Sequence, residues 1–310
     1  MNTISWKILK TICRSEWVRD HLPDKLYLIW QWKCLMKYDF DWDNPQTLNE
    51  KIMWLKLHDR KPLYTTLVDK YKAKEWVREH FGEHLLIPTL AVYSSVDDID
   101  FEKLPNQFVL KCNHDSGNVF ICQDKKSGVY LDKHMHEHDL SYVKQELAAG
   151  LRHNFYLNSR EWPYKNVPPR IIAEKLLVQK DGKMPNDYKL FFINGEFQFV
   201  YVSFDRFGVN DRCTYDRDWK RLPFVWVEPD VYQRGVNSSD VPRPDSFQEM
   251  LDFGTKMAQP FKCVRVDCYD VDGVMYMGEI TPFHSAGYAR FYPNEYDLFF
   301  GRKIDLSDIK

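Results

Sequence analysis

The chain has 310 residues, with 43 lysines and arginines against 45 aspartates and glutamates, so its net charge at pH 7 is −2. This length allows two or three subdomains with a substantial core, and the balanced charge argues against a broad nucleic-acid-binding surface, so no nucleic-acid partner is expected. The seven cysteines, an odd number without a CxxC pair, indicate reduced thiols and a cytoplasmic protein. The sequence lacks an apolar run of about 18 residues, and its amino terminus lacks the signal-peptide pattern.

The amino-terminal region predicts tryptophan-rich helices, the second of which covers residues 24–38 after Pro23. Lysine and arginine side chains lie among the apolar positions, a pattern compatible with a peripheral contact with the inner face of a membrane. A helical cap packed on the main body is the favoured alternative. Farther along the chain, residues 67–80 predict another helix. Its lysines 70, 72 and 74 are either phosphate contacts or, as is usual for lysines at this spacing, a solvated helix face.

Two capping boxes mark helix starts. Thr47 and Glu50 have the T-x-x-E spacing in which the two side chains each satisfy a backbone N–H group at a helix amino terminus. Ser246 and Glu249 repeat this spacing before a predicted helix at residues 247–258.

Residues 107–123 predict two strands joined by a short turn. Lys111 lies at the end of the first strand, directly before the polar turn His114–Asn118, which contains one glycine. A point charge beside free backbone N–H groups suits phosphate binding. The turn matches neither a Walker loop nor GxGxxG, so a P-loop enzyme and a dinucleotide fold are not expected. An ordinary hairpin is the alternative.

Histidines at positions 134, 136 and 138 raise the question of a metal site. Alternate residues share a face only on a strand, whereas this segment leads into a predicted helix at residues 139–151. We therefore do not predict a metal there. The loop 152–169 that follows is either a mobile lid or a plain connection.

The next strands carry charged residues at positions where a ligand can be reached. Residues 170–178 predict a strand with Glu174 and Lys175 in its middle, and its edge amides can pair with the rim of a purine. Asn194-Gly195 predicts a hairpin turn. Arg206 follows the second strand of that hairpin, where a ligand-facing arginine is plausible.

Residues 262–287 predict a β-hairpin on which the functional interpretation depends. With a three-residue loop, Asp270 would pair with Val274, which sets Arg265 opposite Glu279 and leaves Asp267 on the same face. A two-residue loop would place Asp267 and Glu279 on opposite faces, so the three-residue loop is predicted.

The second strand of this hairpin is expected to present Met275, Met277, Glu279 and Thr281 on one face. Asp267, Glu279 and Thr281 would then supply oxygen ligands suited to Mg²⁺ carrying phosphates. The alternative is a solvated hairpin face with a single Arg–Glu pair across the strands.

Taken together, these segments resemble the ATP-grasp ligases, and more closely their TupA-like branch. The resemblance covers about residues 20–305 and rests on six segments: 44–52, 69–71, 108–118, 170–177, 186–196 and 264–282. It implies an α+β protein with the ATP-grasp fold, in which two α+β subdomains hold the nucleotide between them. The expected divisions are a helical region at 1–95, a subdomain with the phosphate loop at 96–180, and a subdomain with the metal site at 181–310.

The resemblance also implies roles for the matching residues. Lys111 and Lys189 would hold the ATP phosphates, and the turn would close over the triphosphate. The full nucleotide-binding set is Lys111, His114, Ser116, Gly117, Glu174, Lys175, Leu177, Asp187 and Lys189. Asp267, Glu279 and, with a hydroxyl where many family members have asparagine, Thr281 would carry Mg²⁺, which Mn²⁺ can replace. The catalytic contacts with the transferred phosphate would be Arg265, Arg206 and Lys189.

The implied activity is ADP-forming ligation of a carboxylate to an amine through an acyl phosphate. The family is associated with bacterial surface polysaccharide and teichuronopeptide synthesis. The expected partners are therefore a small-molecule amine and a uronic-acid-containing glycan or its precursor. Two alternatives remain open: a metal-dependent glycosyltransferase of capsule or O-antigen synthesis that uses Asp270-Val271-Asp272 as a DxD motif, and a non-catalytic polysaccharide-assembly protein.

Overall fold

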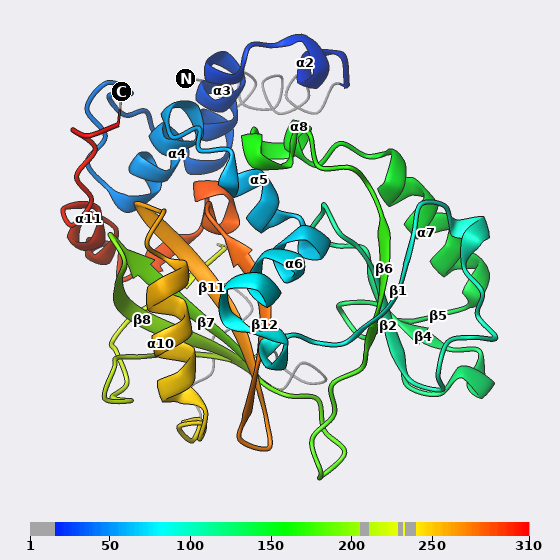
Figure 1. Ribbon diagram of the computed structural model, residues 1–310. Helices are drawn as coiled ribbons and strands as arrows, with labels where there is room; N and C mark the ends of the chain where they lie inside the picture. Colours follow the sequence, from blue (N-terminus) through cyan, green and yellow to red (C-terminus); the bar gives the residue numbers. More distant parts are fainter. Residues whose placement is uncertain (1–15, 205–210, 229–231, 233–239, 310) are drawn as a thin grey trace.

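A computed structural model describes residues 16–204, 211–228, 232 and 240–309 (Figure 1). Arg206 lies outside these residues. The α-helices are α2 (Glu16–His21), α3 (Asp24–Met36), α4 (Leu48–His58), α5 (Leu63–Val68), α6 (Lys70–Phe81), α7 (Leu140–Arg152), α8 (Tyr156–Ser159), α10 (Phe247–Met257) and α11 (Glu295–Gly301).

The strands of the described residues form two larger sheets and one β-ribbon, all with antiparallel neighbours. The six-stranded sheet has the order β1 (Thr89–Tyr93), β6 (Ile171–Lys175), β2 (Phe108–Cys112), β3 (Val119–Cys122), β4 (Tyr130–Leu131), β5 (Glu137–His138). The five-stranded sheet has the order β12 (Val274–Thr281), β11 (Cys263–Val271), β7 (Asp187–Ile193), β8 (Glu196–Phe204), β9 (Asp211–Tyr215). The ribbon pairs β10 (Val225–Val227) with β13 (Arg290–Tyr292).

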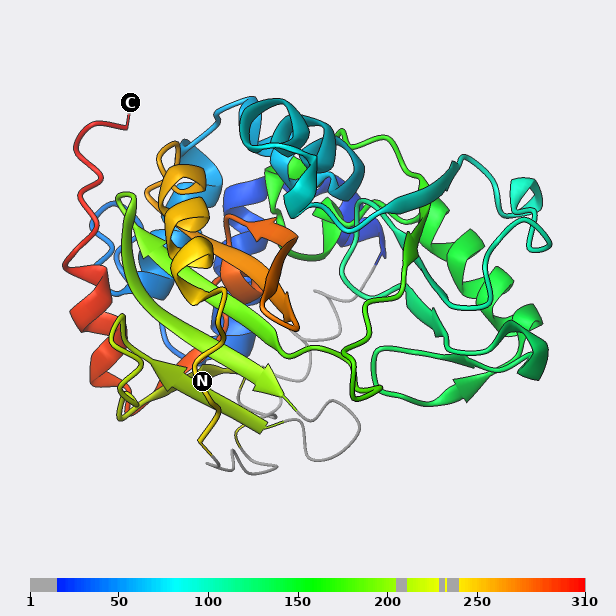
Figure 2. The ribbon, with the colours of Figure 1, turned by 60° about the horizontal axis from the view of Figure 1, so that its bottom comes forward.

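The two larger sheets occupy separate lobes, and α6 lies between them (Figures 1 and 2). Helix α7 covers the six-stranded sheet and α10 covers the five-stranded sheet. This mixture of helices and antiparallel sheets confirms the predicted α+β class. The proposed divisions at 95/96 and 180/181 stay a prediction.

The largest hydrophobic core covers one face of the five-stranded sheet. Alternate residues of β11, Val264, Val266 and Cys268, are buried in this core together with residues of α10. Since neighbouring residues of a strand point to opposite faces, Asp267 and Tyr269 face away from α10. One part of that opposite face is buried in a second hydrophobic core, and the part with Asp267 and Tyr269 lines a cavity toward the other lobe.

The amino-terminal helices pack on the body of the protein. Leu28, Trp32 and Met36 of α3 form a buried cluster with Met53 of α4, which supports the interpretation as a helical cap. Nothing in these contacts supports a membrane-surface role, and residues 1–15 lie outside the description. Within the described part of the chain, every helix is too short or too polar to cross a bilayer.

Three helix starts can be compared with the predictions made from the sequence. The capping box of Thr47 and Glu50 is confirmed. The one at Ser246 is wrong, because its hydroxyl donates instead to Oδ2 of Asp270, 2.5 Å away. The predicted helix at 67–80 is interrupted at Asp69, whose carboxylate accepts the N–H groups of Tyr71 and Lys72 and starts α6 at the next residue.

Candidate functional site

The β11–β12 hairpin has a different turn from the one predicted. Val271 pairs with Val274, so the loop has two residues, Asp272 and Gly273, both left-handed with φ of 52° and 85°. Such a pair forms the type of turn that matches the twist of a hairpin. The predicted three-residue loop is therefore wrong.

A β-bulge nevertheless brings the two carboxylates to one face. The register shifts between Asp267 and Cys268: Cys268 pairs with Met277, Asp267 pairs with Glu279, and Gly278 is the extra residue. Arg265 consequently faces Thr281, not Glu279 as predicted. Because of this shift Met277, like Met275, lies in the hydrophobic core and not on the face of Glu279.

Gly278 is required where the strand bulges. A Cβ atom there would lie 3.0 Å from the ring of Tyr269 and 3.1 Å from the carbonyl oxygen of Asp267. These contacts are tighter than ordinary van der Waals distances, so a larger residue would push the two strands apart. The shared face of Asp267 and Glu279 thus depends on this glycine.

Arg265 joins the acidic residues of the hairpin. Its Nε is 2.6 Å from Oδ1 of Asp267, and its Nη2 lies 2.8 Å from Oδ2 of Asp267 and 2.6 Å from Oε1 of Glu279. The same Nη2 is 3.1 Å from Oγ1 of Thr281. Burial would raise the pKa of Glu279, but the charges of Lys70 and Arg265 hold that pKa at about 2, so the carboxylate is ionised.

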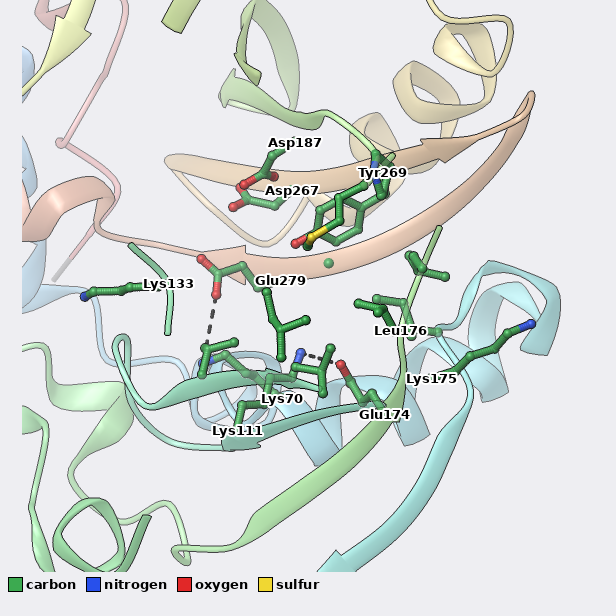
Figure 3. A pocket seen from close by; sticks show the side chains of 18 of the residues that line it. Lys70, Lys111, Lys133, Glu174, Lys175, Leu176, Asp187, Asp267, Tyr269 and Glu279 are labelled. Atoms are coloured by element: carbon green, nitrogen blue, oxygen red, sulfur yellow. Dashed lines mark ion pairs between the residues drawn. The ribbon is translucent and has the colours of Figure 1, made fainter. Parts of the chain in front are cut away.

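Lys189 on β7 completes this side of the site, next to Asp187 and Asp267, which are labelled in Figure 3. Its Nζ is 2.5 Å from Oδ2 of Asp267 and 2.6 Å from Oδ2 of Asp187. Burial alone would lower the pKa of Lys189, but the two carboxylates outweigh it and raise the pKa. The ammonium is therefore retained inside the protein.

The six-stranded sheet contributes a second charged group. Nζ of Lys111 on β2 lies 2.6 Å from Oε2 of Glu174 on β6, and Lys74 of α6 forms an ion pair with the other oxygen of Glu174. Burial acts to lower the pKa of Lys111, but Glu174 reverses the effect and raises it. Glu174 is thus held between two lysines, and its predicted role in nucleotide binding stays a prediction.

Lys70 links the two sides, although the sequence did not distinguish it from Lys72 and Lys74 and it was not among the predicted site residues. As the first residue of α6, it places its Nζ 2.5 Å from the carbonyl oxygen of Asp115 and 3.9 Å from Oε2 of Glu279. The sequence feature that could have distinguished Lys70 is Asp69, a helix-capping residue directly before it, because it places Lys70 at the start of a helix. Lysines 70, 72 and 74 looked alike in sequence, as either phosphate contacts or a solvated helix face.

These groups surround a cavity of about 240 Å³ between the two sheets (Figure 3). In Figure 3, Lys70, Lys111 and Glu279 lie toward one end, the charged end, and Leu176 and Tyr269 lie toward the other, the apolar end. The lining also includes the charged residues Lys189 and Asp267 and the apolar residues Ile87, Val109, Leu177 and Met184. This division of polarity suits a ligand with a flat apolar part and an anionic tail.

The remaining nucleotide-binding predictions are placed as follows. Asp187 and Leu177 line the cavity, and Lys175 lines its apolar end, although its side chain extends outward (Figure 3). The imidazole of His114 is buried against α7, with Nε2 3.1 Å from the carbonyl oxygen of His153. Ser116 and Gly117 lie outside the described lining, so in this structure the turn stands beside the cavity.

The donor set fits a divalent cation that also binds phosphate. Asp267 and Glu279 are cross-strand neighbours at the charged end of the cavity, and Thr281 adds a hydroxyl 3.2 Å from Oε1 of Glu279. Carboxylate oxygens are the ligands that Mg²⁺ prefers, and Mg²⁺ commonly uses only one or two of them together with phosphate and water oxygens. Among the described residues no cluster of three or more His, Cys, Asp or Glu could hold a metal alone.

The alternative acidic and histidine clusters have structural partners. Asp270 accepts hydrogen bonds from Ser246 and from the N–H of Gly273, and Asp272 accepts the N–H of Lys180. These contacts stabilise the turn. Likewise, the carboxylate of Asp132 accepts the backbone N–H groups of residues 134 and 136, and it lies within 3.3 Å of ring nitrogens of the histidines at 136 and 138.

A family model described as TupA-like ATPgrasp matches residues 50–305. A search of curated proteins finds no match. Similar solved structures include D-alanine–D-alanine ligase from Bacillus anthracis (14 % identity, TM-score 0.36, covering 76 % of this chain and 59 % of that one). Others are the Helicobacter pylori enzyme (13 %, 0.43, 84 % and 70 %) and phosphoribosylamine–glycine ligase from Thermotoga maritima (13 %, 0.38, 71 % and 49 %).

Proposed function

Because the chain belongs to the TupA-like ATP-grasp family, we propose that it is an ATP-dependent carboxylate–amine ligase that works in the cavity between its two sheets. One observation carries the proposal. Asp267 and Glu279 form a cross-strand pair at the same end of the cavity as three lysines that reach it from α6, β2 and β7. Carboxylates for a cation and lysines for phosphates are thereby brought together from four parts of the chain.

In this proposal the nucleotide lies across the cavity. The adenine occupies the apolar end, near Leu177 and the edge of β6, while Lys70 and Lys111 contact the phosphates. Asp267 and Glu279, with Thr281 beside them, would hold Mg²⁺ or Mn²⁺. When bound, this ion neutralises charge on the phosphoryl oxygens and orients the transferred group.

The reaction proceeds in two displacements. An oxygen of the substrate carboxylate attacks the γ-phosphorus, and the bond from that phosphorus to the β-phosphate oxygen breaks, giving an acyl phosphate and ADP. The lone pair of an amine then attacks the acyl carbon. The carbon–oxygen bond to phosphate breaks, the nitrogen loses a proton, and an amide and phosphate are formed.

Two cations of the chain are positioned for these steps. Arg265 and Lys189 are fixed by carboxylates at the charged end of the cavity, where negative charge accumulates on the phosphoryl oxygens. Preorganised donors in a water-poor site are effective because they need no reorganisation during reaction. A covalent nucleophile is not needed.

For the substrates, we propose a uronic-acid carboxylate on a surface glycan or its precursor, joined to an amino acid or an amino sugar. The family's association with bacterial surface polysaccharides supports the glycan. A cytoplasmic site of action would fit the ATP requirement.

The test combines ATP, Mg²⁺, uronic-acid oligosaccharides and an amine pool of amino acids and amino sugars. Release of ADP that needs both the carboxylate and the amine is expected. Asp272→Asn, which removes an acid of the DxD motif in the hairpin turn, should retain this ligase activity. Sugar transfer from a UDP- or GDP-sugar, abolished in that variant, would instead establish the glycosyltransferase alternative. No thermal shift with ATP and Mg²⁺ would indicate a non-catalytic protein.

A further inference from the structure

A row of polar side chains begins at Arg265 and leads away from the nucleotide cavity. Nη1 of Arg265 is 2.8 Å from Nδ1 of His284. Nε2 of the same ring is 3.4 Å from the hydroxyl of Ser285, which donates to Oε1 of Glu228 at 2.5 Å. Oε2 of Glu228 lies 3.6 Å from Nη1 of Arg212. None of these contacts is needed to hold ATP.

The two ring nitrogens of His284 make hydrogen bonds of opposite direction along this row. The ring is buried between Trp226 and Tyr201, with centroids 4.0 Å and 5.7 Å away. Burial and the charge of Arg265 lower its pKa well below the usual value. A neutral imidazole has one acceptor and one donor nitrogen. Nδ1 therefore accepts from Arg265 and Nε2 carries the proton toward Ser285.

The backbone around Ser285 is held in an unusual conformation. Ser285 and Ala286 have φ of 43° and 53°, a left-handed region that residues other than glycine rarely adopt. Lys56, fully buried on α4, donates to the carbonyl oxygen of Ala286 at 2.9 Å and to that of Ser159 at 2.8 Å. Such conformations persist where the surroundings fix them, often at functional sites.

Arg212 lies on the same sheet face as the phosphate-binding residues. Asp187 of β7 pairs with Ser203 of β8, which in turn pairs with Arg212 of β9. Cross-strand partners share a face, so Arg212 continues the row that contains Asp187. Asp187, Ser203 and Arg212 therefore form one polar row that runs from the nucleotide end across the sheet.

The hydrogen-bond donors of the Arg212 guanidinium are only partly used. Its buried Nε has no hydrogen-bond partner in the described part of the chain, and its 3.6 Å separation from Glu228 is longer than a charge-assisted hydrogen bond. A buried donor without a partner is costly. Its side chain is 18 % exposed and that of Glu228 is 41 % exposed, so a ligand can reach both.

We propose that Arg212 and Glu228 recognise the amine substrate, and that this substrate is an α-amino acid and not an amino sugar. The two oxygens of an α-carboxylate match the fork of a guanidinium, and the neighbouring carboxylate of Glu228 binds the ammonium before its proton is lost. The two charges of an α-amino acid are attached to one carbon, as the adjacent Arg212 and Glu228 require. The inference rests on the proposed ligase function and deepens it.

Calorimetric titration of the ADP–Mg²⁺ protein tests this without turnover. The twenty common amino acids are titrated one at a time, each beside its decarboxylated amine, together with glucosamine and galactosamine. At least one amino acid should bind, and its amine at least about tenfold more weakly, since a charge-assisted contact is lost.

Variants sharpen the assignment. Arg212→Met should weaken binding of that amino acid by about 10- to 100-fold. Arg212→Lys keeps the positive charge but loses the two-pronged guanidinium, so its affinity for the amino acid should lie between that of the wild type and that of Arg212→Met. Arg217→Met, at an exposed arginine five residues away, should bind like the wild type. Unchanged affinity for ADP–Mg²⁺ and an unchanged melting temperature show that each variant is folded.

Three results would overturn the inference: amino sugars binding as tightly as the best amino acid, amines binding as well as amino acids, or no amino acid binding at all. Loss of binding in Arg217→Met equal to that in Arg212→Met would also contradict it. The proposed ligase activity fails on a different result, the absence of ADP release dependent on a carboxylate and any amine.

Discussion

The two walls of the cavity distribute their charges in opposite ways. At the six-stranded sheet, Lys74 of α6 and Lys111 of β2 share one carboxylate, that of Glu174. On the five-stranded sheet, two cations are set among three carboxylates, namely Lys189 and Arg265 among Asp187, Asp267 and Glu279. One wall therefore has positive charge in excess and the other has negative charge in excess.

This difference explains how one cavity can accept both a polyphosphate and a cation. Surplus ammonium groups on the first wall attract phosphate, whereas surplus carboxylates on the second wall attract a divalent ion. Lys70 stands between the walls, 3.9 Å from Oε2 of Glu279. Substitutions on one wall should therefore have different effects from substitutions on the other.

The largest effect is expected from Lys74→Met on the first wall. Lys74 is buried, pairs with Glu174 and donates to the carbonyl oxygen of Ile87 at 2.8 Å, so removing one partner of a buried ion pair should cost about 3–5 kcal/mol of unfolding free energy. Urea unfolding measures this. Lys111→Met leaves Lys74 in place on Glu174 and should mainly weaken ATP affinity. Equal losses of stability in the two variants would show that the lysines do not have separate roles.

Glu279→Gln tests the second wall. Removing the charge should reduce ligase turnover by about 100- to 1000-fold, while the amide preserves the shape and lowers the melting temperature by no more than about 2 °C. Steady-state ADP release is the measurement. Activity within twofold of the wild type would remove Glu279 from the proposed metal site.

Gly278→Ala tests whether the bulge aligns the second wall. The added Cβ would lie within 3.1 Å of both Tyr269 and Asp267, and such overpacking should cost about 1–3 kcal/mol. Activity should fall by more than this loss of stability explains, because Asp267 and Glu279 shift apart. Gly182→Ala serves as the control: at φ of 84° an alanine is also strained, so this variant should lose stability while keeping the activity of its folded molecules. A Gly278→Ala protein that is destabilised but fully active when folded would contradict the prediction.

The smallest effect is a difference in pH response between the walls. The pKa of Glu279 is lowered from 4.5 to about 2, so its stabilising contribution is present above pH 4.5 and is lost as the pH falls toward 2. About a third of its side chain is exposed, which limits the effect to about 1 kcal/mol or less.

Lys111 should respond at the other end of the pH scale. Its pKa is raised above 10.5, so its contribution is complete below that pH and is lost as the pH rises through the folded-state pKa. The free energy of unfolding of the wild type is compared with that of Glu279→Gln at acid pH and with that of Lys111→Met at alkaline pH. The two differences measure the two contributions. A constant stability difference across either range would contradict the corresponding pKa shift.

The sequence predicts the parts of this arrangement that depend on neighbouring residues. The capping box of Thr47 and the Asn194-Gly195 turn between β7 and β8 are local, and both form as expected. Asp267 and Glu279 do share a face, as predicted. The reason is different, because the bulge at Gly278 compensates for a shorter turn, and a glycine within a strand does not by itself specify a change of register.

Predictions that depend on residues distant in the sequence were harder. Ser246 donates to Asp270 and not to its own helix, a choice made by tertiary packing. Lys70 and Lys74 look alike in sequence, yet one reaches the cavity and the other is buried against Glu174. Arg212 and Glu228 lie in segments of weak pattern, and only the pairing of β8 with β9 reveals their relation to the site.

The central claim is that Asp267 and Glu279 bind the cation that accompanies ATP. A crystal structure with Mn²⁺ and a non-hydrolysable ATP analogue, recorded to give the anomalous signal of manganese, tests it most directly. The account predicts a manganese peak between these two carboxylates and the phosphates, with Lys111 on the phosphate tail. A peak at Asp270 and Asp272, or an analogue bound away from the cavity, would contradict it.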